Sequence, residues 1–262
     1  MRLYFEVARK TFARIATYRQ ATLAGVFTNT VFGFVLAYVL LAVYQERETV
    51  GGFDATDAVT FTFVGQGLLM VVGIFGSTDI AERIRTGDVV VDLQRPYDQQ
   101  AWWAAVSYGN AAYYAIFRGI PPFVIGAIVF DLRTPSPPNF AAFVVSVWLA
   151  LAVCFAWTYM LQLSAFWLMD FRGPYQIGIF VAQFFSGALI PIVFFPSWLE
   201  TTTRALPFPS MMQLPIEVWL GRYHDAALLG VFAQQVLWAC FLIVAGRFIM
   251  SRAVGRIVVQ GG

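Results

Sequence analysis

Residues 141–169 read AAFVVSVWLALAVCFAWTYMLQLSAFWLM, without one acidic or basic side chain among them. A bilayer core is about 30 Å thick, and a helix needs about 20 predominantly apolar residues to cross it. A helix that is apolar on every side has no face for water, which makes so long a run unsuited to a soluble core. The stretch therefore predicts a membrane-spanning helix.

Five more stretches share this character, and with Ala141–Met169 they make six predicted spans: Thr22–Tyr44, Ala58–Gly76, Ala101–Phe130, Ile177–Phe195 and Ala226–Met250. Of the 262 residues, 59% are hydrophobic and 12% are charged, which is typical of an integral membrane protein. We expect an all-α, polytopic chain that forms one transmembrane domain over residues 1–262. Six spans leave no room for a separate soluble domain.

Arginine and lysine are distributed unevenly about the six predicted spans. With the N-terminus inside, the inner side receives twelve of them: Arg2, Arg9, Lys10, Arg14, Arg19, Arg83, Arg85, Arg95, Arg172, Arg247, Arg252 and Arg256. The outer side receives four, which are Arg47, Arg133, Arg204 and Arg222. Cytoplasmic loops are enriched in Lys and Arg. We therefore expect a multi-pass protein of the inner or plasma membrane of a bacterium, with both termini in the cytoplasm.

Residues 1–20 have the pattern of a helix that lies on the membrane surface. Basic residues occupy one face, and the other carries Tyr4, Phe5, Ala8, Phe12 and Ile15. A basic amphipathic helix next to a span lies in the membrane interface, near anionic lipid headgroups. The segment lacks the continuous apolar core of a cleavable signal peptide. A frayed basic tail is the alternative.

Residues that carry catalysis are scarce in this sequence. The only lysine is Lys10, which has no glycine-rich loop near it, so a phosphate-binding P-loop is excluded. The only histidine, His224, has no second metal ligand at a suitable spacing and no nucleophile-elbow sequence around it. Cys154 and Cys240 fall in apolar spans, and we interpret them as small buried side chains. We expect no enzyme, no metal and no cofactor in this chain, and no nucleic-acid partner.

The loop between the second and third spans, residues 77–100, contains a short amphipathic helix. Asp79 marks its N-terminus, and Gly87 provides a C-terminal cap. Its two isoleucines lie on one face, which needs a surface to pack on, and we expect a partner protein to supply that surface. The residues with a predicted role in this contact are Asp79, Ile80, Ile84, Gly87, Leu93, Arg95 and Pro96.

Residues 196–225 follow the fifth span and form short apolar pieces separated by prolines. Ser197 and Glu200 have the spacing of a capping box, so we expect a short helix to begin there. The pieces are too short to cross a bilayer and too apolar for a free loop. We expect short re-entrant helices that dip into the outer leaflet. An ordinary outer loop with interfacial aromatic residues is the alternative.

Two motifs stand out in these two segments. The first is Ile84-x-x-Gly87-Asp88-x-x-x-x-Leu93-x-Arg95-Pro96, and the second runs from Ser186-Gly187-Ala188-Leu189-Ile190-Pro191 through Phe195-Pro196-x-Trp198-Leu199 to Leu206-Pro207-Phe208. They resemble the first cytoplasmic loop, and the fifth span with its outer helices, of ABC-2-type transporter permeases, the ABC-2 family transporter protein group. The order and spacing of the motifs extend the resemblance over nearly the whole chain.

The resemblance implies the membrane subunit of an ATP-driven exporter with the ABC-2 type exporter fold. Two such permeases, identical or homologous, associate in the membrane with two copies of a separate ABC ATP-binding subunit, which holds ATP and Mg²⁺. The loop at residues 77–98 would be the coupling helix that docks on this subunit. The cargo would be an amphiphilic or drug-like substrate that moves outward.

Polar residues within the spans are candidates for the translocation pathway: Asn29, Gln66, Asn110, Arg118 and Gln183. Hydrogen bonding between helices is the alternative for each of them. Arg118 is unusual, because an intramembrane charge costs about 2.5–3.5 kcal/mol on insertion scales. Two roles remain open for Arg118: a structural ion pair or carbonyl contact, or a contact with a cavity. Apolar side chains can close a pore by excluding water, and we expect an outer gate formed by Trp198, Phe208, Met211 and Met212.

Two further classes of function remain open from the sequence. A non-transporting membrane anchor or assembly subunit would carry the same kind of loop, because coupling and anchoring loops look alike. An integral membrane enzyme that modifies lipids would need clusters of His or Asp near the membrane, which the sequence lacks. An adjacent gene for an ATP-binding cassette protein would favour the exporter.

Overall fold

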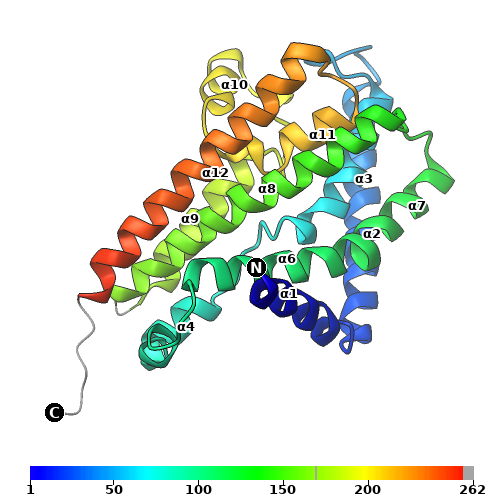
Figure 1. The fold of residues 1–262 in the computed structure, drawn as a ribbon. Coiled ribbons are helices and arrows are strands. Elements are labelled where there is room, and N and C mark those ends of the chain that lie inside the picture. The colour runs from blue at the N-terminus through cyan, green and yellow to red at the C-terminus, as the bar shows by residue number, and fades with distance from the viewer. Residues whose placement is uncertain (169, 256–262) are drawn as a thin grey trace.

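The computed structural model describes residues 1–168 and 170–255, and Figure 1 shows their arrangement. The elements are α1 (Arg2–Ile15), α2 (Arg19–Val43), α3 (Ala55–Val71), α4 (Asp79–Thr86), α5 (Val89–Leu93), α6 (Gln99–Tyr114), η1 (Ala115–Gly119), α7 (Ile120–Val129), α8 (Pro137–Leu163), η2 (Ser164–Phe166), α9 (Arg172–Phe185), η3 (Ile192–Phe194), α10 (Ser197–Arg204), η4 (Phe208–Ser210), α11 (Gln213–Trp219) and α12 (Asp225–Val254). No strand occurs among these residues. The predicted all-α fold class is confirmed.

Four helical segments are long and apolar enough to cross a membrane. They are α2, the run from α6 through η1 to α7, α8 with η2, and α12, with 25, 31, 30 and 30 residues. The second predicted span corresponds to α3, which has 17 residues. The count of six spans therefore stays a prediction. Met169, the last residue of the fourth predicted span, lies outside the described residues.

The fifth predicted span, Ile177–Phe195, is wrong as one continuous helix. Helix α9 begins earlier, at Arg172, and ends at Phe185 after 14 residues. Beyond it, Gly187 adopts a left-handed conformation with φ of 84°, which glycine reaches without steric cost. A Cβ at this position would lie 2.4 Å from the Oε1 atom of Gln213. The chain therefore turns where the apolar run alone predicted a helix.

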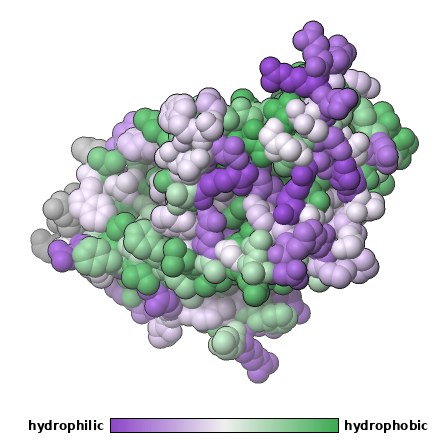
Figure 2. All heavy atoms as spheres, turned by 90° about the horizontal axis from the view of Figure 1, so that it is seen from above, coloured by the Kyte–Doolittle hydropathy of each residue, from purple (hydrophilic) through white to green (hydrophobic). Residues whose placement is uncertain are grey.

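With α3 and α9 counted among them, the successive helices of the bundle alternate in direction, and one end of the molecule holds α1, α4 and the end of α12 (Figure 1). We name this the inner end, and the opposite end, with α10 and the start of α12, the outer end. Both described termini thus lie at one end, as the charge distribution predicted. Arg256, one of the twelve inner charges, lies outside the described residues. The membrane side that each end faces stays a prediction. Figure 2 shows the outer end, where hydrophilic side chains gather over the middle.

The main core lies between α3, α8, α11 and α12. Helices α8 and α12 run side by side in the same direction (Figure 1). Gln235 joins them: its Oε1 accepts from Ser146 Oγ at 3.0 Å, and its Nε2 donates to the carbonyls of Ser146 and Ser210 at 3.1 and 3.0 Å. Its polar atoms are thus paired inside the core, which supports an interhelical hydrogen-bonding role for this glutamine.

Helix α1 is formed as the amphipathic pattern predicted, and the frayed tail is wrong. It packs along α6, where Phe12 and Tyr113 place their ring centroids 5.5 Å apart. A Cβ at Gly109 would lie 2.4 Å from the carbonyl oxygen of Ala8, so a glycine permits the close approach. Phe5 remains exposed. The position of α1 in a membrane interface stays a prediction.

Candidate functional site

Helix α4 receives its N-terminal cap from a distant part of the chain. The first N–H groups of a helix have no partner within it, and Thr78 makes no capping bond through its side chain. Instead, Oε1 of Gln162 in α8 accepts from the backbone N–H of Ile80 at 2.9 Å and of Ala81 at 3.4 Å. The start of the inner loop helix is therefore attached to α8 at a defined point.

The apolar face of α4 packs on this same chain. Ile80 is buried in a cluster with Phe155, Tyr159 and Leu163 of α8, and Ile84 packs partly buried against that cluster. We expected these isoleucines to require a partner protein, and the structure corrects that expectation. The sequence showed the amphipathic pattern, but it could not show that α8 extends far enough inward to cover it.

The other end of α4 turns sharply into α5. Gly87 has a φ of 84° and caps the helix, which confirms its predicted role. Arg83 of α4 forms an ion pair with Asp92 of α5, in which Nη2 lies 2.9 Å from Oδ1. The guanidinium of Arg83 donates hydrogen bonds from Nε and Nη2 to Asp92, and these bonds raise its pKa. The two short helices therefore form one connected unit, which we call the inner hairpin (residues 79–93).

Helix α9 holds the inner hairpin from a second side. The hydroxyl of Tyr175 donates to the carbonyl of Ser77 at 2.7 Å, just before α4 begins. Arg172 Nη2 lies 3.3 Å from Glu82 Oε1. Hydrogen bonds from Arg85 and then Arg172 lower the pKa of this Glu82 carboxyl. The hairpin is thus fixed to both α8 and α9, so a force on it reaches both of these helices.

The exposed side of the inner hairpin is mostly polar. Val91 is the exception, with 54% of its surface exposed. Among the predicted coupling residues, Ile80 is buried, Ile84 and Leu93 are half-buried, and the exposed ones are Asp79, Gly87, Arg95 and Pro96. Sequence reasoning missed the exposed Arg85, Asp88 and Val91. The surface open to a partner is therefore the back of the hairpin and the turn after it.

The five predicted pathway residues do not form one site. Asn29 of α2 donates from Nδ2 to the Gln66 carbonyl of α3 at 3.1 Å, and both residues are buried, which supports the interhelical alternative for Asn29. Gln66 lines a cavity of about 100 Å³ beside Gly187 and Pro191. Asn110 lines a different cavity at the inner end. Gln183 is half-buried, and its carbonyl accepts from Ser186 Oγ at 3.1 Å.

Arg118 lies in the π-helical segment η1, a type of helical irregularity that is frequent at functional sites. Its guanidinium rests on α2, where a Cβ at Gly25 would lie 2.0 Å from Nη2. Its Cζ atom lies 5.4 Å from the centroid of the Tyr114 ring, and no carboxylate within the described ranges pairs with it. Gly25 comes six residues after the start of α2, which is about 9 Å along a helix. Arg118 therefore lies toward the inner end of α2.

The outer segment, residues 196–225, is formed by short helices as predicted, but most of it belongs to the core. Phe208, Met211 and Met212 are buried in the main core cluster, whereas Trp198 is 69% exposed. These four residues therefore do not share one lining, and the structure corrects the predicted gate for the three that are buried. The predicted capping box is also wrong, since α10 begins at Ser197 without a capping bond from a side chain.

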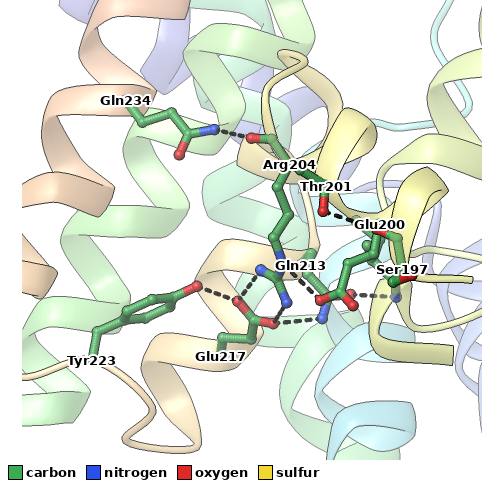
Figure 3. Close-up of polar contacts among 9 residues, drawn as sticks. Ser197, Glu200, Thr201, Arg204, Gln213, Glu217, Tyr223 and Gln234 are labelled. Carbon is green, nitrogen blue, oxygen red and sulfur yellow. Dashed lines mark hydrogen bonds and ion pairs between the residues drawn. The ribbon is translucent and has the colours of Figure 1, made fainter. Parts of the chain in front are cut away.

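A buried ion pair holds this segment together, as Figure 3 shows. Arg204 of α10 donates from Nη1 and Nη2 to the two carboxylate oxygens of Glu217 in α11, at 3.1 and 2.9 Å. Gln213 Nε2 donates to Glu217 Oε1 at 2.8 Å, and Tyr223 donates to Oε2. Gln234 of α12 donates to the Arg204 carbonyl at 2.7 Å. We call this set the Glu217 network; its sequence signal was an acidic residue inside an apolar run.

A second set of ion pairs joins the outer ends of α3 and α12 to the loop before α8. Asp54 and Asp57 form a capping box at the start of α3. Arg133 Nε lies 2.6 Å from Asp57 Oδ1, and Arg133 also pairs with Asp54. Arg222 pairs with the other oxygen of Asp57. All four groups are outer loop charges in the sequence, where nothing indicated which of them would meet.

The described residues contain no group of three His, Cys, Asp or Glu side chains that could hold a metal ion. Comparison with curated proteins and with solved structures gave no match. A family model for the ABC-2 family transporter protein matches residues 28–261, which include the inner hairpin and the outer segment. The chain therefore belongs to the ABC-2 family of transporter proteins.

Proposed function

We propose that this chain is the permease subunit of an ATP-driven exporter that moves an amphiphilic or drug-like substrate outward. Membership of the ABC-2 family implies association with a separate ABC ATP-binding subunit. In this proposal two permeases, identical or homologous, assemble with two such subunits, and ATP and Mg²⁺ are bound there. The complex lies in the inner or plasma membrane of a bacterium, with both termini in the cytoplasm.

The inner hairpin is the observation that carries the proposal. Its apolar face is covered by α8, and its bonds to Gln162 and Tyr175 hold it against α8 and α9. The opposite face is exposed at the inner end and offers Arg85, Asp88 and Val91, and the turn after the hairpin adds Arg95. A docking surface passes on the movement of its partner only if it is held firmly against the helices behind it.

The experiment is reconstitution of the permease with its ATP-binding subunit in vesicles, followed by substrate-stimulated ATP hydrolysis and transport. Arg95→Glu should weaken co-purification of the ATP-binding subunit, because it reverses a charge on the exposed docking surface. Arg47→Glu is the matched control, since Arg47 is equally exposed but lies in the loop at the outer end. The control should leave co-purification and transport unchanged.

Two outcomes would contradict the proposal. Normal co-purification and normal transport in Arg95→Glu and in Val91→Asp would exclude the hairpin as the docking surface. An assembled complex that hydrolyses ATP but moves no substrate across the bilayer would instead favour the non-transporting anchor or assembly subunit. The substitutions therefore test where the ATP-binding subunit docks, and the transport assay tests whether the complex is an exporter.

A further inference from the structure

Two cavities adjoin between the helices, and both open to the surface, since Ile116 and Ile120 of the outer one and Asp79 of the inner one are exposed. The outer cavity has a volume of about 310 Å³ and lies between α3, the α6–η1–α7 run, α8 and Trp219 of α11. The inner cavity, of about 210 Å³, lies between the same long helices and the first turn of α4. Val71, Ala111 and Leu151 line both cavities, so these three residues form the boundary between the two.

The two cavities differ in chemistry. Aliphatic and aromatic side chains and glycines line the outer cavity, with no ionisable group among them. The inner cavity contains one charged residue, Asp79, which makes no ion pair within the described part of the chain. It also contains Asn110, whose Oδ1 atom is buried without a hydrogen-bond partner. A buried acceptor without a donor is costly, and a bound group that donates a hydrogen bond would satisfy it.

Aromatic rings complete the lining of the inner cavity. Trp103, Tyr114 and Phe155 contribute to it, and no Lys, Arg or His does. Aromatic faces and a carboxylate both attract a cation, whereas a carboxylate repels an anion. The inner cavity thus favours a positively charged group that donates hydrogen bonds, and the outer cavity favours an apolar body.

We infer that the two adjoining cavities bind one cationic amphiphile, with its protonated amine beside Asp79 and Asn110 and its apolar body in the outer cavity. The inference rests on the proposed function only in treating this occupant as cargo, because binding itself requires the permease alone. Binding at this site would also bear on coupling to the inner hairpin. Asp79 and Ile80 belong to the first turn of α4, and Gln162, which caps that turn, also lines the inner cavity. An occupant therefore contacts the inner hairpin directly.

The test uses 1-pyrenemethylammonium, with neutral 1-pyrenemethanol and anionic 1-pyreneacetate as probes of matched apolar body. Energy transfer from tryptophan to pyrene reports binding to the permease in lipid nanodiscs, since Trp103, Trp148 and Trp219 line the cavities. We expect saturable binding of the ammonium probe, about tenfold tighter than that of either analogue. Asp79→Asn should remove most of this preference and leave binding of the alcohol unchanged.

A pair of variants tests the outer cavity. Val144→Trp should abolish binding of all three probes, because Val144 lines the cavity and is 38% exposed, so a larger side chain fills free space. Val145→Trp is the control, since Val145 is 49% exposed and lies outside the lining. Thermal melting of each variant verifies that it is folded. Folded Val144→Trp with unchanged probe binding would overturn the assignment of the apolar body.

Other outcomes separate this site from the proposed function. Equal affinity for the three probes, or an unchanged preference in Asp79→Asn, would overturn the inference. A reconstituted complex that transports substrate while its permease shows no saturable probe binding would overturn this site and leave the exporter standing. Saturable, charge-dependent binding without transport would support the site and contradict the exporter.

Discussion

The inner hairpin and the outer segment are both built from short helices between long ones, yet they use their residues in opposite ways. The hairpin covers one face with α8 and leaves its other face exposed at the inner end. The outer segment places Met211, Met212 and the residues of α11 from Gln213 to Val218 in the interior. One region therefore presents a surface, while the other completes the core.

The polar groups of the two regions follow the same division. The Glu217 network is closed: each carboxylate oxygen has partners inside the segment, and its side chain is 3% exposed. In the hairpin, the pair between Glu82 and Arg85 is partly exposed at both partners, whereas in the other pair Asp92 is buried and only Arg83 is partly exposed. Buried pairs of this kind are costly to break, whereas exposed ones contribute little. Substitutions in the two regions should therefore differ in kind.

Glu217→Ala should have the largest effect. It leaves Arg204 without its buried partner, and removing one member of a buried pair typically costs about 3–5 kcal/mol. We expect a sharp fall in the melting temperature of the purified permease, and loss of transport follows from loss of fold. Glu200→Ala is the matched control, because Glu200 also pairs with Arg204 at 2.9 Å but is partly exposed. A melting temperature equal to that of the wild type in Glu217→Ala would remove the contrast between the two regions.

Gln162→Ala should have an intermediate effect of a different kind. It removes the cap of α4, and loss of a capping side chain costs about 0.5–2 kcal/mol. The long helices keep their packing, so we expect a small change in melting temperature but a clear fall in substrate-stimulated ATP hydrolysis. Gln183→Ala is the control, since it makes the same change of side chain at a half-buried position of α9 that does not contact the hairpin. Equal ATP hydrolysis in both variants would show that the cap does not affect coupling.

The smallest effect concerns pH at the outer end. Partial burial raises the pKa of Asp54, but the hydrogen bond from the Asp57 backbone and the pairing with Arg133 outweigh it and lower the pKa below 3.8. A carboxyl group with a lowered folded-state pKa contributes stability above its unfolded value, and this contribution is lost as pH falls through the folded value. Melting temperatures of the wild type and Asp54→Asn should therefore differ at pH 6, begin to converge below about pH 4, and meet only once the pH is below the lowered pKa of the folded state. A difference that persists at the lowest pH would contradict this account.

The sequence predicted the features that depend on local pattern. The uncharged runs predicted long helices, the amphipathic N-terminus predicted α1, and Gly87 predicted the cap of α4, because each follows from composition or from a single backbone requirement. It failed where distant segments meet. The cover of Ile80 by α8 and the burial of Met211 depend on packing that no local pattern encodes. The end of α9 at Phe185 depends on Gly187 and Gln213, which only the fold brings together.

In the proposed exporter, the exposed face of the inner hairpin and the turn after it contact the ATP-binding subunit. A photo-reactive benzoylphenylalanine placed at residue 91 or 95 in the purified complex tests this contact most directly, with position 80 as the buried control and position 47 as the control at the outer end. We expect crosslinks to the ATP-binding subunit from positions 91 and 95 and none from positions 80 and 47. Crosslinks from position 47, or their absence at both positions 91 and 95 in an assembled complex, would contradict the proposed contact.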